Sequence, residues 1–406
     1  PIGFVRWTEQ RNFEAVLDMM ASGLLDVKSL ITHRFDIDQA LDAYNLLNES
    51  TALGILLNYP AQDKSLLRLA SINLKEKIDN MYIPTEPVFG FIGAGNYSSR
   101  FLIPIFKGIS SNLDTLVTSS GVSGIHHGNK AGFRSTSTDL DSIWLNSKIN
   151  CVVIVTPHNQ HADQIISALN TGKNVFVEKP LAIKLDEINA IDSAYKKCNK
   201  NRNQPLHLMV GFNRRFAPFV LKMKSLLSVS NDPKTIVITV NAGSIQSDHW
   251  TQDQEIGGGR IIGEVCHFID LMRFIIGHSI ISHHSVMIGK TPGVEVTNDK
   301  VSISLVFKDG SIGTIHYFAN GGQVYPKERI EVFCGDAVLQ LNNYRELKGF
   351  GWPGFRIMKA LKQDKGQKNC IKAFINSMKD GKESPIPYEE LIEVSRVSIN
   401  VSESLI

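Results

Sequence analysis

A lysine and a histidine are the residues best suited to carry chemistry in this chain. Lys179 lies in the run VFVEKPLA, after an apolar stretch rich in Val, and Glu178 precedes it. A lysine at the carboxyl end of a parallel strand lies in the crevice where α/β sheets bind ligands, and it can stabilise charge that develops on an oxygen atom. His267 lies in the run GEVCHFIDL, and an imidazole suits proton transfer near neutral pH.

A glycine-rich turn lies upstream of both, in the run FGFIGAGNYSSR. Gly93 would allow a tight turn, and Gly95 would let the backbone approach a pyrophosphate at the start of a helix that contains Asn96 and Tyr97. Ser98 occupies the place of the usual third glycine, where a small side chain can pack. The motif predicts a dinucleotide site, although an ordinary strand–helix turn is the alternative on this run alone.

The choice of dinucleotide stays open. An NAD site usually places Asp or Glu after the second strand, whereas this chain has Thr118-Ser119-Ser120 there. Ser119 could bind a ribose hydroxyl or a 2′-phosphate, with Lys130 or Arg134 near it. The expected cofactor is therefore NAD or NADP.

The elements that would position these residues alternate between strands and helices over residues 87–215. Apolar runs predict five strands, and helical patterns such as HADQIISALNTG separate them. This alternation implies an α/β fold with a doubly wound parallel sheet, the Rossmann type, covered on both faces. The strands are expected at 88–93, 113–119, 150–156, 174–179 and 206–212.

Residues 216–406 follow a different pattern. Apolar and polar residues alternate over 234–243, 300–321 and 328–343, with hairpin turns between the strands. Together with a helix pattern at about 260–276, this indicates an α/β domain with a large, open, mostly antiparallel sheet.

The first 80 residues fit neither domain. Amphipathic helices are expected at 12–26 and 36–48, a strand at 52–60, and a polar linker over 61–86. Residues 1–60 are too few to bury much of a core. Because the chain starts with Pro1 rather than Met, we expect it to be a piece of a longer protein.

Composition excludes several classes of protein. The 406 residues carry 43 Lys and Arg against 40 Asp and Glu, which gives no electrostatic case for nucleic acid or a membrane surface. No apolar stretch reaches the length of about 18 residues that spans a bilayer. The five cysteines are scattered without a CxxC pair, which fits a reducing cytoplasm and disfavours a zinc or disulfide framework.

Three further runs resemble the Gfo/Idh/MocA family of NAD(P)-dependent sugar and cyclitol oxidoreductases. They are TPHNQHADQIISALNTGKNVFVEKPLA, GFNRRFAP and GGGRIIGEVCHFIDL, and the resemblance covers about 87–390. It implies that Lys179 holds the substrate and helps place the nicotinamide, that His267 is the general base, and that the second domain makes homo-oligomer contacts. The cofactor-binding residues expected from these runs are Thr156, Pro157, His158, His161, Glu178 and Lys179.

One position departs from the family pattern. Many members carry an aspartate four residues before this histidine, where the chain has Gly263. Glu264 is adjacent but points elsewhere on an undistorted helix. Either Glu264 takes that place through a local distortion, or His267 and Lys179 act without a carboxylate. Asp270 could orient the imidazole from the same face of the helix.

Other candidates have two interpretations each. Arg214 and Arg215 could hold a substrate carboxylate or phosphate, or they could form structural ion pairs. His249 and Trp250 could line a sugar pocket, or belong to the core or a lid. The histidine pairs at 126–127 and 283–284 have no acidic partner nearby, so no metal site is expected.

The first 48 residues resemble the closing part of zinc-type medium-chain alcohol dehydrogenases, through ITHRF followed by the helix pattern QALDAYNLL. The resemblance implies a fusion of two oxidoreductase modules, of which this chain keeps one and the tail of the other. That family's metal ligands and cofactor turn lie upstream, so no zinc is expected.

The sequence therefore predicts a cytoplasmic enzyme that transfers hydride between NAD(P) and a secondary alcohol of a sugar, a cyclitol or a nucleotide sugar, in surface polysaccharide synthesis. Two alternatives remain. Ser98, Gly263 and the missing acidic residue favour a non-catalytic NAD(P)-binding sensor or assembly module. A dehydratase or glycosidase with an NAD redox cycle would have the same fold.

Overall fold

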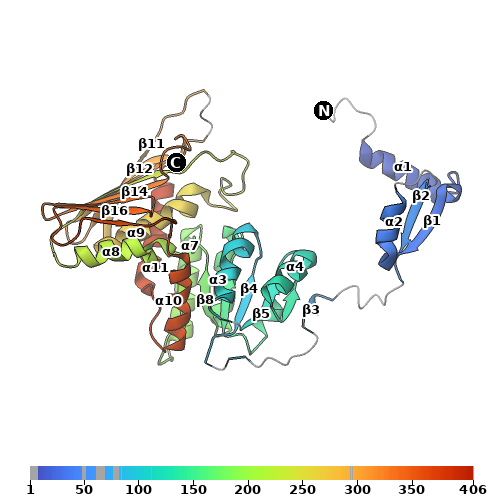
Figure 1. Ribbon diagram of the computed structural model, residues 1–406, viewed down its shortest axis with the longest axis horizontal. Helices are drawn as coiled ribbons and strands as arrows, with labels where there is room; N and C mark the ends of the chain where they lie inside the picture. The colour runs from blue at the N-terminus through green and yellow to red at the C-terminus, as the bar shows by residue number, and fades with distance from the viewer. Residues whose placement is uncertain are drawn as a thin grey trace. The chain divides into compact units, whose positions relative to one another are not determined.

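The computed structural model describes residues 8–47, 52–60, 69–75, 82–83, 85–110, 112–292, 294 and 296–405. The chain forms two compact units, Pro1–Leu69 and Ala70–Ile406. The larger unit contains a seven-stranded sheet, drawn in blue to green in Figure 1, and an eight-stranded sheet, drawn in yellow to red. Among the described helices, none has both the length and the apolar character needed to cross a bilayer.

The N-terminal unit is a small β–α–β arrangement preceded by the helix α1 (Glu9–Ala21). Strands β1 (Ile31–Asp36) and β2 (Gly54–Asn58) pair in parallel, and α2 (Ala40–Leu46) connects them. The expected helices and the expected strand are present, and β1 is an addition. Among the described residues of this unit, Ala43 is the one buried hydrophobic side chain, so the unit has almost no core of its own.

The seven-stranded sheet is a Rossmann sheet. Its strand order is β3-β6-β5-β4-β7-β8-β9: after the edge strand β3, the chain enters the middle at β4, moves through β5 and β6 towards β3, and then crosses to the other side through β7, β8 and β9. All neighbours are parallel except β3, which pairs antiparallel with β6 at the edge. The five expected strands are confirmed. The strands are β3 (Ser71–Asn73), β4 (Phe89–Ile92), β5 (Leu113–Val117), β6 (Ser135–Ser137), β7 (Cys151–Ile154), β8 (Asn174–Val177) and β9 (Leu208–Val210).

Part of the expected 61–86 linker belongs to this sheet. Ser71 lies opposite Ser137 in the β3–β6 pair, and their hydroxyl groups are hydrogen-bonded at 2.8 Å. Short polar strands lack the apolar pattern of the buried strands, which is why the sequence does not reveal them. The Rossmann sheet therefore begins earlier than residue 87, while 61–68 and 76–81 lie outside the described residues.

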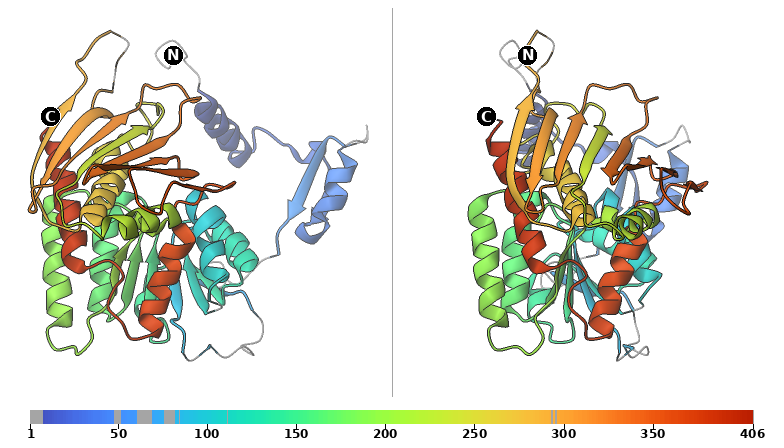
Figure 2. Two further views of the ribbon diagram at one scale, coloured as in Figure 1. Left: turned by 60° about the vertical axis from the view of Figure 1, so that its left-hand side comes forward. Right: turned by 90° about the vertical axis from the view of Figure 1, so that its left-hand side faces the viewer.

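Helices cover both faces of this sheet, as the right-hand view of Figure 2 shows. All four residues of β4 and all four of β7 are buried as a result, and their Phe, Val and Ile side chains form the core. The expected helix at 161–172 is confirmed. The covering helices are α3 (Ile103–Lys107), α4 (Gly121–Ala131), α5 (Asp141–Trp144), α6 (His161–Asn170) and α7 (Leu185–Asn199).

The second sheet has the order β11-β12-β13-β10-β14-β15-β16-β17 and is antiparallel except for the β10–β13 pair. Alternate residues of its central strands are buried against α8 (Pro218–Leu227) and α9 (Cys266–Ile276), and the other face is open. The expected open, mostly antiparallel sheet is confirmed. The strands are β10 (Thr235–Asn241), β11 (Ile280–Met287), β12 (Lys300–Phe307), β13 (Ile312–Phe318), β14 (Glu328–Cys334), β15 (Ala337–Asn342), β16 (Glu346–Phe350) and β17 (Ile357–Lys359).

The last two helices, α10 (Gln367–Lys379) and α11 (Tyr388–Glu403), return to the Rossmann sheet. Phe374 of α10 packs against Phe176 of β8, with ring centroids 5.5 Å apart. Figure 2 shows both helices, in red, running down beside the green strands. The segment 216–406 is therefore not one separate body in space, because the apolar faces of its C-terminal helices complete the core of the first domain.

Candidate active site

A cavity of about 680 Å³ opens at the carboxyl ends of the parallel strands β4, β7 and β8. The strand order reverses between β4 and β7, and doubly wound sheets bind ligands at such a point. The wall opposite the strand ends comes from the second domain and from the segment before α10. The lining residues are Gly95, Asn96, Tyr97, Ser98, Val155, Thr156, Pro157, His158, His161, Glu178, Lys179, Asn213, Arg214, Trp250, His267, Lys365 and Gln367.

The glycine turn forms one end of this cavity. Gly93 has a φ of +99°, and a Cβ atom there would lie 2.3 Å from the Val155 carbonyl oxygen, so no larger residue fits without a shift of the backbone. Ser98 is fully buried, and its hydroxyl donates to the Gly93 carbonyl oxygen at 2.9 Å. Nothing lies within 4 Å of a Cβ placed on Gly95. The backbone there is open to a phosphate, which is what a dinucleotide site requires.

A second cavity, of about 650 Å³, continues from the same turn and is lined by the helices that follow it. It shares Gly95 and Asn96 with the first cavity and is also lined by Arg100, His127 and Lys130. Arg100 and Lys130 therefore place positive charge beside the glycine turn, whereas burial lowers the pKa of His127.

The other sequence candidates for this end lie elsewhere. Ser119 is exposed just after β5 and lines neither of these two cavities. Arg134 does not join it, because the guanidinium carbon lies 3.7 Å from the centre of the Tyr82 ring.

His161 joins the ends of two strands. Its ring nitrogens lie 2.7 Å from the Pro180 carbonyl oxygen and 3.0 Å from the Thr156 carbonyl oxygen. The side chain is fully buried, and burial lowers its pKa. The ring thus holds the backbone after β7 against the backbone after β8.

His158 joins the Rossmann domain to the loop that contains Trp250. Its Nδ1 lies 2.8 Å from the Gly257 carbonyl oxygen, and its ring packs edge-on against the indole at 4.8 Å. Burial, assisted by Lys179, lowers the pKa of His158 to about 3, so the ring is neutral. Trp250 lines the cavity as expected, whereas His249 is exposed, bonds to a neighbouring hydroxyl and is not part of the lining.

Lys179 and Glu178 follow β8 directly. The Lys179 ammonium donates to the Gly263 carbonyl oxygen at 2.6 Å, so it reaches from the Rossmann sheet to the second domain. An ammonium has three N–H donors, which leaves two for another acceptor. Burial raises the pKa of Glu178 to about 7, although the neighbouring Lys179 opposes that rise.

His267 enters the cavity from α9, and its side chain is 7% exposed. Its Nδ1 has no hydrogen-bond partner among the described residues. Burial, followed by the charges of Arg214 and Lys179, holds the pKa of His267 well below its usual value. The imidazole is therefore neutral and can accept a proton from a hydroxyl group.

Asp270 does not orient this ring, contrary to the expectation from sequence. Its carboxylate accepts a hydrogen bond from Arg215 Nε at 3.1 Å, and Arg215 Nη1 donates to Glu390 at 2.9 Å. Three positions along a helix turn a side chain by about 60°, which is enough to place Asp270 in the core. Arg215 and Asp270 form a buried structural ion pair, so neither reaches a substrate.

The helix with His267 begins with a π-helical turn, η8 (Ile261–Val265). A π turn holds one extra residue and redirects the side chains near it. The local distortion that could move Glu264 is thus present. A Cβ atom on Gly263 would lie 3.1 Å from His158 Cε1, so an aspartate at 263 would press against that ring.

Glu264 lies beside the cavity rather than in its lining. Its carboxylate accepts hydrogen bonds from the Tyr317 hydroxyl at 2.6 Å and from Arg260 at 3.2 Å. Burial opposes its ionisation, but Arg260 and Lys179 lower its pKa below the usual value. Glu264 is therefore a charged neighbour of Lys179 that is hydrogen-bonded to Tyr317 and Arg260.

Three side chains far apart in sequence form one cluster, the Arg214–Glu328–Lys365 cluster. Arg214 donates to Glu328 through Nε and Nη2, both at 2.9 Å, and Lys365 donates to the same carboxylate at 2.6 Å. The two cations line the cavity, whereas the Glu328 side chain is fully buried. Burial opposes ionisation of Glu328, but its two partners lower its pKa to about 2.

Several lining residues are not indicated by the sequence pattern. Asn213 neighbours a motif that is recognised, but Lys365 lies in a loop and Gln367 begins α10, and neither belongs to such a motif. The signal that could have found them is Gly366, which has a φ of +86° and where a Cβ atom would lie 2.4 Å from the Asn213 carbonyl oxygen. Such a glycine marks a close approach of two backbones.

Two family models match the chain. One, described as "Oxidoreductase family, NAD-binding Rossmann fold", matches residues 88–204, and the other, described as "GFO/IDH/MocA C-terminal domain", matches 232–340. The chain belongs to the Gfo/Idh/MocA family of oxidoreductases. Its Rossmann domain is the NAD-binding domain of that family, in agreement with the open glycine turn.

Curated relatives of this Gfo/Idh/MocA protein include inositol dehydrogenases. The inositol 2-dehydrogenase of Rhizobium meliloti is 24% identical over 73% of this chain and 89% of its own length. The myo-inositol 2-dehydrogenase of Thermotoga maritima is 24% identical over 53% of this chain and 64% of its own length. A solved levoglucosan dehydrogenase, in complex with NADH and levoglucosan, covers 78% of this chain and 96% of its own, with a TM-score of 0.67 and 21% identity. That structural likeness shows the fold.

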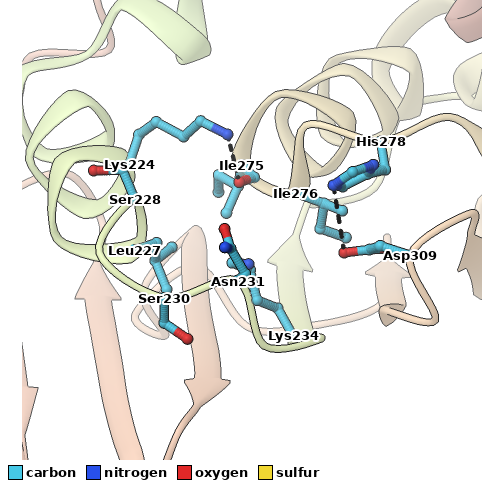
Figure 3. Close-up of a pocket in the computed structure, with 10 residues that line it drawn as sticks. All are labelled: Lys224, Leu227, Ser228, Ser230, Asn231, Lys234, Ile275, Ile276, His278 and Asp309. Atoms are coloured by element: carbon cyan, nitrogen blue, oxygen red, sulfur yellow. Dashed lines mark hydrogen bonds and ion pairs between the residues drawn. The ribbon is translucent and has the colours of Figure 1, made fainter.

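A further hollow in the Gfo/Idh/MocA chain, of about 390 Å³, lies away from the strand ends (Figure 3). Its charged groups are already bound: Lys224 donates to the Ile275 carbonyl oxygen at 3.0 Å, and His278 lies 4.0 Å from Asp309. No group of three or more His, Cys, Asp or Glu residues in the described part of the chain could hold a metal ion.

Proposed function

We propose that this protein transfers hydride between NAD or NADP and a secondary alcohol of a sugar or cyclitol. The observation that carries the proposal is that Lys179 and a neutral His267 line the same cavity as the open glycine turn. Relatives named inositol 2-dehydrogenase and levoglucosan dehydrogenase support the class of substrate.

The chain's own residues can bind the substrate oxygen and accept the proton of its hydroxyl group. The free N–H groups of Lys179 hold the substrate oxygen and stabilise the negative charge that grows on it. His267 accepts the hydroxyl proton, because its depressed pKa leaves the ring uncharged. A dinucleotide held by Gly95 and the residues that follow β7 would supply the hydride acceptor. In this assignment Thr156, Pro157, His158 and Glu178 shape the nicotinamide end of the cavity.

The test is an assay of nicotinamide reduction with the purified full chain, NAD or NADP, and a panel of aldoses and inositols. Turnover of at least one member is expected. Bound cofactor without any redox change across the panel would favour the non-catalytic sensor. Net sugar conversion without net reduced cofactor would instead identify the redox-cycling dehydratase or glycosidase.

The choice of cofactor rests on the region beside the glycine turn. Exposed Ser119 and Ser120 provide hydroxyls without a carboxylate, and Arg100, His127 and Lys130 line the adjoining cavity. Because these groups do not repel a 2′-phosphate, we expect NADP to bind at least as tightly as NAD. Separate fluorescence titrations with NADH and NADPH test this expectation.

We also propose an oligomeric state and a cellular location for the protein. The open face of the second sheet carries exposed Ile312, Phe318 and Phe333, which supports a homo-oligomer through that face. Light scattering of the purified chain measures its subunit number. The five free thiols support a reducing, cytoplasmic location, which fractionation tests.

The N-terminal unit is proposed to be the tail of a zinc-type medium-chain alcohol dehydrogenase, in a chain organised as 1–60, a linker, a Rossmann domain and 216–406. The parallel β1–α2–β2 unit with its near absence of a core supports this origin. Deleting 1–60 is expected to leave cofactor binding unchanged, and loss of cofactor binding would contradict it.

A further inference from the structure

The charges that line the active-site cavity are unbalanced in favour of cations. Lys179, Arg214 and Lys365 all line it. Glu178 is the one acidic residue in the lining, and its pKa of about 7, raised by burial, leaves it only partly ionised at neutral pH. Glu328 is fully charged but fully buried, so it neutralises one of its two partners and meets no ligand itself.

The nearest other carboxylates do not correct this imbalance. Glu264 is bound by Arg260 and Tyr317, and Arg260 also lies 3.8 Å from Asp299. Lys300 donates to Asp299 at 2.6 Å. In this network two carboxylates, Glu264 and Asp299, are paired with two cations, Arg260 and Lys300. These carboxylates therefore do not neutralise the excess positive charge of the cavity lining.

The two cations of the Arg214–Glu328–Lys365 cluster are held in place and still have donors to offer. The Arg214 guanidinium lies over the Phe268 ring at 4.8 Å, and the Lys365 ammonium lies over the Tyr344 ring at 5.8 Å. Lys365 gives one of its three N–H groups to Glu328, and Arg214 binds that carboxylate without using Nη1. A rigid pair of cations with free donors is suited to a second oxyanion.

We propose that the substrate is an anionic sugar, whose carboxylate or phosphate binds Arg214 and Lys365 while its hydroxyl group meets Lys179 and His267. This inference rests on the proposed function and names its class of substrate. A neutral sugar would exclude water from these cations without replacing it by an acceptor of opposite charge, which is costly. An anionic group replaces that water with charge-assisted hydrogen bonds.

The experiment measures binding of matched sugar pairs to the full chain loaded with reduced cofactor, by calorimetry. The carboxylate pairs are D-glucuronate with D-glucose and D-galacturonate with D-galactose. The phosphate pair is D-glucose 6-phosphate with D-glucose. We expect the anion of at least one pair to bind about tenfold or more tightly than its neutral partner, the effect of a hydrogen-bonded charge. The pair that responds identifies the oxyanion as a carboxylate or a phosphate.

Variants of Lys365 test whether this residue causes the tighter binding of the anionic sugar. Lys365→Gln should remove most of the anion preference and leave the affinity for the neutral partner within about twofold. Lys365→Arg keeps the charge and should keep the preference. The matched control is Lys362→Gln in the same loop, because that lysine is exposed and does not line the cavity. Cofactor binding by each variant shows that it is folded.

Three outcomes separate this inference from the proposed function. Equal affinity within every pair, or an equal loss for both partners in Lys365→Gln, overturns the inference. Efficient hydride transfer with neutral sugars and no anion preference overturns the inference but upholds the oxidoreductase. Tight anion binding that depends on Lys365, with no hydride transfer across the panel, upholds the oxyanion site and contradicts the proposed function.

Discussion

The two walls of the active-site cavity are held in place in different ways. The Rossmann wall, made of the glycine turn and the residues that follow β7 and β8, is positioned by main-chain hydrogen bonds and buried strands. The second wall, made of Arg214, Trp250, His267 and Lys365, depends on side-chain contacts between distant segments. Arg214 and Glu328, for example, are 114 residues apart. The Rossmann wall suits a constant ligand such as a dinucleotide, whereas the second wall can change with the substrate.

The strongest test of this division is to remove one catalytic group from each wall. His267→Asn and Lys179→Met should each lower turnover by about 10²–10⁴-fold, the usual contribution of a positioned acid or base. His267→Asn should leave the affinity for reduced cofactor unchanged, because the Rossmann wall is intact. Steady-state kinetics and nicotinamide fluorescence measure the two effects. Unchanged turnover in both variants would contradict the assignment.

Glu328→Gln should remove the ion pairs that hold the second wall together. The substitution leaves the largely buried Arg214 and Lys365 without a carboxylate, so the free energy of unfolding should fall by up to about 3–5 kcal/mol, as for other broken buried ion pairs. Urea denaturation measures the change. Glu331→Gln, on the same strand but partly exposed with Arg329, is the control and should cost at most about 1 kcal/mol. Equal effects would mean that the cluster does not hold this wall.

Substitutions of two glycines in the Rossmann wall should affect stability and cofactor binding separately. Gly93→Ala places a methyl group against the Val155 carbonyl at a positive φ, so it should lower the free energy of unfolding by about 1–3 kcal/mol. Gly95→Val faces open space, so it should leave stability nearly unchanged but weaken cofactor binding by obstructing the approach of the phosphates. Thermal melts and NADH titrations distinguish the two. Reversed effects would remove Gly95 from the cofactor site.

Glu178 should make the stability of the protein depend on pH. Its pKa of about 7 lies above the ordinary glutamate value of 4.5, so the folded state binds a proton more tightly than the unfolded state. Between these two pH values the contribution of Glu178 to the free energy of unfolding should therefore fall as pH rises, by about 1–2 kcal/mol once solvent in the cavity is allowed for. The histidines with lowered pKa in the same cavity contribute the opposite slope, so the quantity to measure is the difference between the wild type and Glu178→Gln. Denaturation from pH 4.5 to 8 should show that this difference falls as pH rises, whereas the difference between the wild type and the control, exposed Glu383→Gln, should stay flat.

Glu264 should give the smallest effect, on catalysis rather than folding. Because Glu264 acts electrostatically on Lys179 from outside the lining, Glu264→Gln should lower kcat/KM by about tenfold or less. A loss as large as that of His267→Asn would instead place Glu264 among the groups that contact substrate. Kinetics at saturating cofactor decide between these possibilities.

Local sequence patterns were enough to locate the Rossmann wall. Buried strands are short apolar runs, the turn after β4 needs a glycine at Gly93, and Lys179 follows β8 directly, so neighbours in sequence determine all three. The edge strand β3 and its neighbour β6 were not found this way, because their pairing uses serine hydroxyls and main chain rather than an apolar pattern.

The second wall was decided by the tertiary structure. His267 and Arg214 could be named from their motifs, but the partners of these residues could not. Asp270 of α9 pairs with Arg215, and Glu328 of β14 pairs with Arg214. Lys365, in the loop before α10, also pairs with Glu328. Each of these pairs depends on the position that a helix face or a strand end takes in the packed structure. Sequence therefore determined the fold and the position of the glycine turn, while long-range packing decided which charges line the cavity, because Coulomb interactions depend on distance in space and not on distance along the chain.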